Sequence, residues 1–269
     1  MKIAIIGCGY VGSALAYHLK EMGHYVTVTT RSPEKVSALQ PISDAVCILE
    51  GNDLGRMKDL LQHQDAIVIS VAADSQKTYR AAYQETADII AQAVPSAPHL
   101  KQIVYTGSTS VYGDHQGHEV DEMTPPTTLH DTSQILLETE RILLGLSNAE
   151  RHVCLFRLGE IYGPNREIKD RLRQMNGRSL PGDGSSVTNL SHLDEIVRGI
   201  VFALETSLDG VYNLCNDVHI SRKALYARIC QEEGLDDVKW DPSRESIHSG
   251  NKLVSSAKIK SKGFQFLNK

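Results

Sequence analysis

The chain has 269 residues, of which 41% are hydrophobic, so it is long enough for one large domain, or one and a half, around a substantial core. Its formal net charge of −5 argues against nucleic acid or an anionic membrane surface as the main partner, because the average field repels both. The five cysteines have no CxxC spacing and no HExxH motif occurs, so we expect reduced thiols and no metal site. No apolar run approaches the roughly 20 residues of a membrane helix. Together these features predict a cytoplasmic protein.

The N-terminal segment has the pattern of a strand, a turn, a helix and a second strand. Lys2–Ile6 is a short β-branched run that predicts a buried parallel strand. Apolar residues recur at helical spacing over Tyr10–Met22, and Gly23 follows where a left-handed cap ends a helix. Tyr25–Thr29 is the next run with strand character. The succession predicts a β-α-β unit.

Three glycines, Gly7, Gly9 and Gly12, form a GxGxxG pattern between the first predicted strand and the first helix. The first permits a tight turn, the second lets the backbone approach a pyrophosphate, and the third lets the helix pack close to the strand. The helix N-terminus at Tyr10 and Val11 offers N–H groups and a positive dipole end to phosphates. This context predicts a bound dinucleotide. The alternative is a glycine-rich packing turn without a ligand.

Thr30, Arg31 and Ser32 end the second predicted strand, where an NAD-selective site usually places an Asp or Glu for the ribose hydroxyls. Arg31 can pair with a 2′-phosphate, and the two hydroxyl groups can add hydrogen bonds. The segment therefore favours NADP as the cofactor, with NAD as the alternative. A different interpretation is that Ser32 caps the next helix, with Pro33 at its first position, and leaves Arg31 in solvent.

Strand-like and helix-like stretches alternate through the rest of the chain. This alternation predicts an α/β fold of the Rossmann type, a doubly wound parallel sheet with helices on both faces, followed by a small C-terminal substrate lobe. Residues 1–163, with 188–216 returning to them, form the predicted NAD(P)-binding domain, and 164–187 with 217–269 form the predicted substrate-binding lobe. Further strands are expected at Val46–Leu49, Ala66–Val71, Gln102–Thr106, Val153–Arg157 and Val211–Leu214, and helices at Pro33–Leu39, Met57–Gln62, Thr78–Ala93, Thr132–Leu146, Leu193–Glu205 and Arg222–Glu233.

Three segments point to a known family: IVYTGSTSVYG (Ile103–Gly113), RLGEIYGP (Arg157–Pro164) and GDGSSVTNLSHLDEIVRGI (Gly182–Ile200). With them the chain resembles the extended short-chain dehydrogenase/reductase superfamily, and more narrowly its NAD-dependent epimerase/dehydratase-type proteins. The resemblance spans nearly the whole chain and implies a Rossmann-type fold that binds NAD(P). Such families include nucleotide-sugar epimerases, dehydratases, ketone reductases and members that only bind the cofactor, so the fold does not choose among these activities.

By the same resemblance, two further segments would contact the cofactor. Asp53 and Leu54 would flank the adenine, and Val71, Ala72 and Ala73 would run under the pyrophosphate and the nicotinamide ribose. For Asp53 the alternative is a turn or helix-cap residue.

Family members with chemistry usually pair a Ser or Thr after the fifth strand with a YxxxK motif on the next long helix. Positions four apart share a helix face, so the Lys can lower the pKa of the Tyr while the Tyr exchanges a proton with the substrate oxygen. Ser108 matches the serine position, but the aligned helix has Thr132 at the tyrosine position and Leu136 at the lysine position. A Thr hydroxyl ionises too weakly to replace Tyr, and Leu supplies no charge, so the standard pair is missing.

Three explanations compete for the missing pair. In the first, another residue acts as acid or base, and the candidates closest to the motifs are Tyr112, His130, Glu160 and His192. In the second, the chain binds its cofactor without turnover. In the third, the helix alignment is shifted, although no nearby Tyr and Lys four apart support a shift. The alternative role of Tyr112 is a ring packed at the strand end, and that of His192 is to order the loop before the next helix.

The segment PNREIKDRLRQMNGR is rich in arginine on the expected substrate side. Arg166, directly after the YGPN turn, is the first candidate to bind a substrate phosphate or carboxylate, and His192 is the second substrate-binding candidate. The alternative for the arginines is a solvated helix face. The sequence thus predicts an NAD(P)-dependent oxidoreductase or epimerase/dehydratase-like protein for a small polar or sugar-like substrate, as a monomer or homodimer. The alternative function is a non-catalytic NADP(H)-binding sensor or scaffold.

Overall fold

The computed structural model describes residues 1–127, 130–244 and 250–267, and the chain divides into two compact units. The first unit comprises Met1–Ser108, His130–Arg157 and Ile196–Tyr212, and the second comprises Thr109–Leu129, Leu158–Glu195 and Asn213–Lys269. Within the described residues, no helix combines the length and the apolar character needed to cross a membrane. No disulfide joins any two of the five cysteines, all of which the structure describes.

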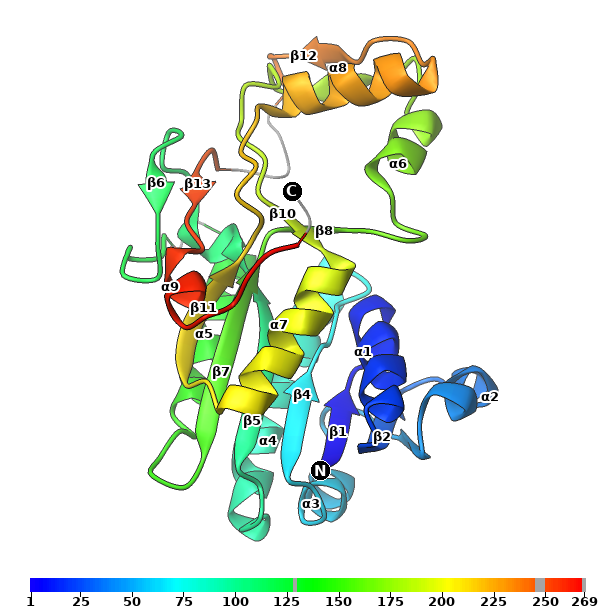
Figure 1. Ribbon diagram of the computed structural model, residues 1–269, viewed down its shortest axis with the longest axis vertical. Coiled ribbons are helices and arrows are strands. Elements are labelled where there is room, and N and C mark those ends of the chain that lie inside the picture. The colour runs from blue at the N-terminus through cyan, green and yellow to red at the C-terminus, as the bar shows by residue number, and fades with distance from the viewer. Residues whose placement is uncertain (128–129, 245–249, 268–269) are drawn as a thin grey trace. The chain divides into compact units, whose positions relative to one another are not determined.

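A seven-stranded sheet forms the centre of the first unit (Figure 1). Neighbouring strands follow the order β11-β7-β5-β4-β1-β2-β3. β1 pairs in parallel with β2 on one side and with β4 on the other, so that Ile3 lies between Val26 and Ala66. This order confirms the predicted doubly wound α/β fold. The strands are β1 (Lys2–Ile6), β2 (Tyr25–Thr30), β3 (Ala45–Ile48), β4 (Ala66–Ile69), β5 (Gln102–Ser108), β7 (His152–Leu158) and β11 (Gly210–Leu214).

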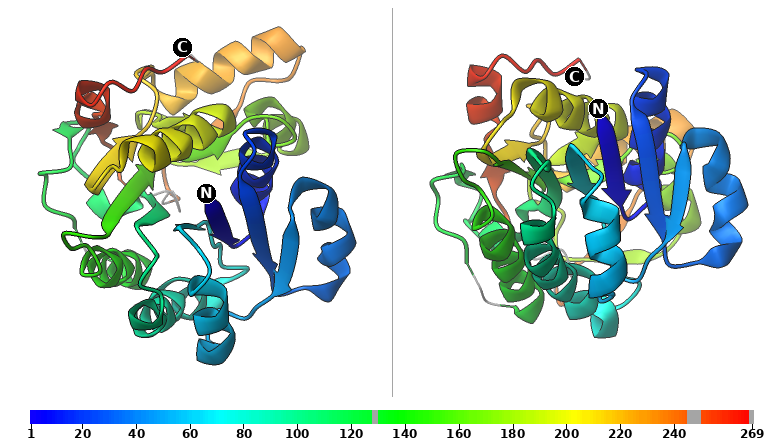
Figure 2. Two further views of the ribbon diagram at one scale, coloured as in Figure 1. Left: turned by 60° about the horizontal axis from the view of Figure 1, so that its bottom comes forward. Right: turned by 90° about the horizontal axis from the view of Figure 1, so that it is seen from below.

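Helices cover both faces of this sheet (Figure 2). α1 (Tyr10–Glu21) and α7 (Leu193–Thr206) lie on one face, and α3 (Leu54–Leu61), α4 (Thr86–Ala93) and α5 (Asp131–Leu144) lie on the other. The second group encloses a core in which Met57, Leu61, Ile90 and Tyr105 are fully buried. Because β4 is covered on both faces, it is apolar throughout.

The helix predicted over Thr78–Ala93 is interrupted. A short turn, η3 (Gln76–Thr78), and a π-helical turn, η4 (Ala81–Glu85), precede α4. The Thr86 hydroxyl donates a hydrogen bond to the carbonyl oxygen of Ala81, five residues back, at 3.1 Å. This side-chain bond competes with the regular helical pattern and favours the wider turn. The other short helical elements are η1 (Pro33–Lys35), α2 (Val36–Leu39), η2 (Gln40–Ile42), η5 (Val94–Ser96) and η6 (Thr109–Tyr112).

The second unit contains strands of two or three residues and three helices among its described residues. Strands this short carry too little periodicity for a sequence pattern to predict them. α8 (Arg222–Glu233) has its predicted bounds, because the Ser221 hydroxyl accepts from the Ala224 N–H at 3.1 Å and Gly234 ends the helix at φ +64°. The remaining elements are the strand pairs β6 (Glu119–Val120) with β13 (Leu253–Val254), β8 (Glu160–Tyr162) with β10 (Leu190–His192), and β9 (Ser179–Pro181) with β12 (Lys239–Asp241), and helices α6 (Ile168–Gln174) and α9 (Ala257–Ser261).

Candidate functional site

The turn between β1 and α1 requires glycine at its first position. Gly7 has φ +92°, and a Cβ atom there would lie 2.5 Å from the carbonyl oxygen of Ser70. The Gly7 N–H donates to the Thr29 hydroxyl on β2 at 3.0 Å. Any side chain at this position would therefore strain the backbone and push it away from β4.

The other two glycines of the motif meet different demands. A Cβ atom at Gly12 would lie 2.4 Å from the Gly7 carbonyl oxygen, so this glycine allows α1 to begin against the turn. At Gly9, which precedes α1, a Cβ atom would have no neighbour within 4 Å. Gly9 thus faces open space at a helix N-terminus, where the N–H groups of Tyr10 and Val11 belong to the first turn. This cradle fits a pyrophosphate, as the glycine pattern predicts.

At the end of β2, Arg31 is held in an ion pair. Its Nη2 atom lies 2.8 Å from Oδ2 of Asp74, and the two side chains are 52% and 75% exposed. Thr30 is nearly buried, and its hydroxyl accepts from the Ser32 N–H at 3.1 Å. Ser32 does precede the short helix that begins with Pro33, but in the described structure its side chain makes no capping hydrogen bond. The expected cap position is correct and the expected capping bond is wrong.

Asp53 has the geometry of a helix cap. Its Oδ1 atom accepts from the Arg56 N–H at 3.0 Å and so caps α3, whose first residue is Leu54. Arg56 in turn donates to the carbonyl oxygen of Ile48, at the end of β3, at 2.7 Å. The cap therefore ties the start of α3 to the same sheet edge as the glycine turn.

The segment after β4 lies directly against the glycine turn. The Cα of Val71 would be 3.0 Å from a Cβ atom at Gly7. Two residues further, the backbone of Ala73 makes a hydrogen bond with Tyr83, and burial raises the pKa of the Tyr83 hydroxyl. Ala72, between them, is exposed. The structure thus places Val71 beside the glycine turn, and the family resemblance assigns both to one cofactor site.

The expected catalytic positions lie at the end of β5 and on α5. Ser108 is the last residue of β5 and is half-buried. On α5, Thr132 is half-buried in the first turn, and Leu136 is only 2% exposed. A charged group buried as deeply as this side chain would need a polar or charged partner, because burying an unpaired charge is costly. The lysine position of the motif is therefore part of the hydrophobic packing in this protein.

A buried ion pair lies one turn beyond Leu136. The Arg157 guanidinium on β7 contacts the Glu140 carboxylate at 3.1 Å through Nε and at 2.7 Å through Nη2, and the two side chains are 6% and 4% exposed. Burial raises the pKa of Glu140, and the contact with Arg157 opposes that shift. Gly107 packs over this carboxylate, 3.6 Å from a Cβ position to Oε1. The pair was not predicted from the sequence, although an acid on an apolar helix face was a signal for it.

Three acid–base candidates have structural partners. Tyr112 is fully buried and its hydroxyl donates to Oδ1 of Asn213 at 2.8 Å, a packed environment of the kind expected for the alternative role. His192 Nδ1 accepts from the N–H of Asp194 at 3.2 Å, at the start of α7, as expected of a residue that orders this loop. The exposed His130 is the N-cap residue of α5, and its carbonyl oxygen accepts from Ser133 at 3.0 Å.

The fourth candidate, Glu160, lies between two arginines in the second unit. It forms ion pairs with Arg171 of α6 and, at 3.2 Å, with Arg222 of α8. Arg222 also donates to the hydroxyl of Tyr226 at 2.9 Å. Arg222 was not predicted, because nothing near it in the sequence indicates that its partner comes from β8.

The substrate-binding candidate Arg166 lies in the turn after β8. Its backbone N–H donates to the Gly163 carbonyl oxygen at 2.9 Å and closes this turn.

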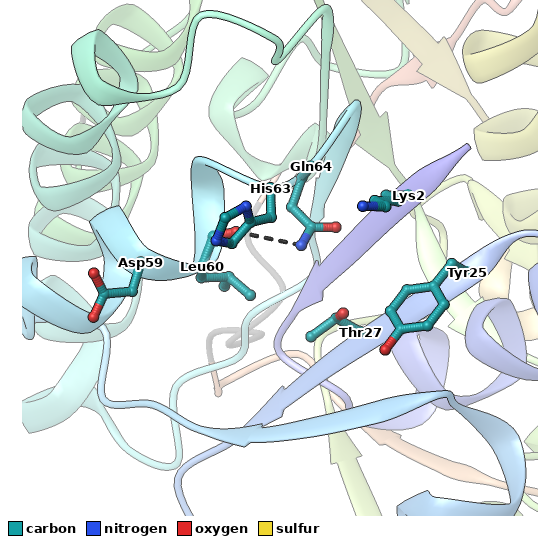
Figure 3. Close-up of a pocket in the computed structure, with 7 residues that line it drawn as sticks. All are labelled: Lys2, Tyr25, Thr27, Asp59, Leu60, His63 and Gln64. Atoms are coloured by element: carbon teal, nitrogen blue, oxygen red, sulfur yellow. Dashed lines mark hydrogen bonds between the residues drawn. The ribbon is translucent and has the colours of Figure 1, made fainter.

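A pocket of about 470 Å³ lies at the opposite edge of the sheet (Figure 3). Lys2 and Tyr25, which line it, are the first residues of β1 and β2, whereas Gly7 follows the far end of β1. Gln64 reaches into this region and donates to the Leu60 carbonyl oxygen at 3.3 Å (Figure 3). The other lining residues are Thr27, Asp59 and His63. None of these residues belongs to the predicted site, so the pocket is separate from it.

The sequence profile of the NAD dependent epimerase/dehydratase family matches residues 3–215. That span is most of the chain and includes the glycine turn, β5 and α5. The chain belongs to this family. The resemblance inferred from the three motifs is therefore confirmed.

Relatives of this chain extend over its whole length. Protein YeeZ of Escherichia coli (strain K12) is 31% identical over 283 residues, which cover 98% of this chain and 95% of YeeZ. A functionally unknown conserved protein from Silicibacter pomeroyi DSS has a TM-score of 0.79 at 24% identity, over 98% of this chain and 93% of that one. MoeE5, solved in complex with UDP-glucose and NAD, has a TM-score of 0.84 at 19% identity, over 100% and 94%. At these identities the two solved structures show a common fold.

The Tyr–Lys pair expected from the family resemblance is not found in this chain. None of its ten tyrosines is followed four residues later by a lysine. The glycine turn of the family is complete, and its Tyr–Lys pair is absent from the sequence.

Proposed function

We propose that this protein binds NADP(H) at the glycine turn and transfers hydride to or from a small polar or sugar-like substrate. The observation that carries the proposal is the cradle between β1 and α1, in which Gly9 faces open space while Gly7 and Gly12 admit no side chain. A dinucleotide supplies a hydride donor or acceptor when bound. The family membership and the NAD bound to MoeE5 support the same class of cofactor, with NAD as the alternative.

Different segments of this chain would bind different parts of the cofactor. N–H groups of Tyr10 and Val11 and the glycine backbone would hold the pyrophosphate. Asp53 and Leu54 would flank the adenine, and Val71, Ala72 and Ala73 would lie along the pyrophosphate and ribose. Arg31 would pair with the 2′-phosphate, with Thr30 and Ser32 shaping the turn beside it through their mutual hydrogen bond.

The proposed chemistry rests first on Ser108. Its hydroxyl, at the end of β5, would donate a hydrogen bond to the substrate oxygen whose charge changes during hydride transfer. Tyr112 remains the candidate for proton transfer, and its hydroxyl would first have to leave Asn213. Arg166 and His192 would contact the substrate. Residues 164–187 and 217–269 would form the lobe that selects it.

A titration of the purified protein with NADPH and with NADH tests the cofactor proposal. A charge-assisted pair between Arg31 and a 2′-phosphate is worth about 1–3 kcal/mol, which corresponds to roughly 5- to 150-fold in affinity. NADPH should therefore bind more tightly, and Arg31→Asp should reverse the order. Equal affinities in the unmutated protein that Arg31→Asp leaves unchanged would remove Arg31 from the site. Hydride exchange with a panel of carbonyl compounds and sugar nucleotides then tests turnover.

The second candidate function is a non-catalytic NADP(H)-binding sensor or scaffold. It is favoured by Leu136, which is buried where catalytic members of the family carry a lysine. Restoring the motif with Thr132→Tyr and Leu136→Lys separates the two functions. A gain in carbonyl reduction would support a retained active-site frame, whereas no gain in a folded, cofactor-binding variant would support the sensor. The melting temperature must be measured alongside, since the new lysine is introduced into a buried position.

We also propose a cytoplasmic location and a monomeric or homodimeric state. The absence of disulfides among the five described cysteines fits a reducing compartment. Fractionation of cells and sedimentation of the purified protein would check these two proposals.

A further inference from the structure

The Arg31–Asp74 ion pair connects two strands that are not neighbours. Arg31 directly follows β2, and Asp74 lies five residues beyond the end of β4. In the sheet these strands flank β1, so their ends lie roughly 10 Å apart. The pair therefore spans the end of β1, where the glycine turn begins. Asp74 also lies only three residues after Val71, which packs beside that turn.

We propose that Asp74 is a specificity-determining residue that limits the preference of this site for NADP(H), an inference that rests on the proposed cofactor function. Its carboxylate already forms an ion pair with the Arg31 guanidinium group, which a 2′-phosphate would need as its own partner. The phosphate must either displace Asp74 or bind beside it, with like charges about 5–6 Å apart. NADH, which has only a hydroxyl at that position, meets no such repulsion.

The charges near Arg31 support this competition. The pair leaves the Arg31 position without net charge, and the exposed Glu34 and Lys35 that follow cancel each other. Because both partners of the ion pair are more than half exposed, the pair itself adds little stability and can open at low cost. Asp74 is thus placed to adjust the charge that the cofactor meets and not to hold the fold together.

Asp74→Asn tests the proposal, with Asp59→Asn as a matched control. The control removes the same charge from an exposed position on α3, at the opposite edge of the sheet. Both variants and the parent are titrated with NADPH, NADH and adenosine 2′,5′-bisphosphate. In Asp74→Asn, NADPH and the bisphosphate should bind about 5- to 10-fold more tightly, and NADH should change by less than about 2-fold. Asp59→Asn should change none of the three.

Other results would overturn the proposal. Unchanged NADPH binding in Asp74→Asn, or an equal gain for NADH, would show that Asp74 does not discriminate between the cofactors. Weaker NADH binding in Asp74→Asn would show that the carboxylate binds ribose hydroxyls. In the background of Arg31→Ala, Asp74→Asn should give less than half of its gain, and an undiminished gain would contradict competition for Arg31. If the parent binds no dinucleotide at all, the proposed function itself fails, and this result is distinguishable from the others.

Discussion

The glycine turn after β1 and the expected catalytic positions on β5 and α5 belong to the same unit of the protein and match the family pattern to different extents. At the glycine turn every required position is present, because a Cβ atom at Gly7 or Gly12 would collide with backbone. On α5, Leu136 stands where the family pattern leads us to expect a lysine, and its apolar side chain is buried. Backbone packing therefore restricts the glycine positions of the turn to glycine even without a ligand. A Tyr–Lys pair, in contrast, is required only by the proton transfer that it performs.

The frame beneath the catalytic positions is nevertheless well defined. Glu140 and Arg157 join α5 to β7 by a two-point ion pair, and Gly107 packs over the carboxylate. A buried ion pair therefore joins α5 to β7 in a chain whose sequence has no Tyr–Lys pair. Substitutions at the ion pair and at the glycine turn show which of the two regions tolerates less change.

The largest effect is expected for Arg157→Ala. Removal of the guanidinium leaves the Glu140 carboxylate buried without its partner, which should lower the free energy of unfolding by about 3–5 kcal/mol. Denaturant unfolding measures it. The paired replacement Glu140→Gln with Arg157→Met removes both charges and should cost clearly less. A loss below about 1 kcal/mol in Arg157→Ala would show that the frame does not depend on the ion pair.

Gly12→Ala and Gly9→Ala should separate packing from binding at the glycine turn. Gly12→Ala forces a methyl group against the Gly7 carbonyl oxygen and should cost about 3 kcal/mol of stability. Gly9→Ala meets no neighbour, so its melting temperature should stay near that of the parent, while NADPH affinity should fall by about 10-fold or more. Unfolding curves and titrations of both variants check this. A Gly9→Ala protein with full affinity would mean that the open space is not the cofactor cradle.

Ser108→Ala should affect catalysis only. If the protein turns over, loss of the hydroxyl should lower kcat/KM by about 10-fold or more through a lost transition-state hydrogen bond, with NADPH affinity nearly intact. Steady-state kinetics and a titration on the same preparation measure both quantities. Unchanged turnover would exclude Ser108 from the mechanism and leave the two regions functionally unconnected.

The smallest effect is expected for Asp53→Ala. Loss of the cap on α3 should lower stability by about 1 kcal/mol. A residue that only caps the helix should leave dinucleotide affinity unchanged, whereas one that also flanks the adenine should weaken NADPH and NADH equally. Comparing the two affinities in Asp53→Ala therefore decides between the two roles of this residue.

The fold and the glycine turn could be predicted from the sequence. Apolar runs at strand and helix spacing gave all seven strands of the central sheet, with ends correct to within one or two residues. The turn was predictable because its demands are local: a positive φ at Gly7 and a close approach at Gly12 arise within a dozen residues and leave glycine in the sequence. The same locality explains the correct bounds of α8, whose cap and terminal glycine adjoin it.

Which charged residues form ion pairs could not be predicted from the sequence and depends on the three-dimensional fold. Arg31 and Asp74 are 43 residues apart in the chain, and Glu140 and Arg157 are 17 apart. An acid on an apolar helix face indicates that a partner is needed, but no local pattern identifies which residue that partner is. Their pairing follows from the order of strands in the sheet, which places the end of β2 and the segment after β4 on either side of β1. That order, and not the residues near Arg31, brought Asp74 to the proposed cofactor site.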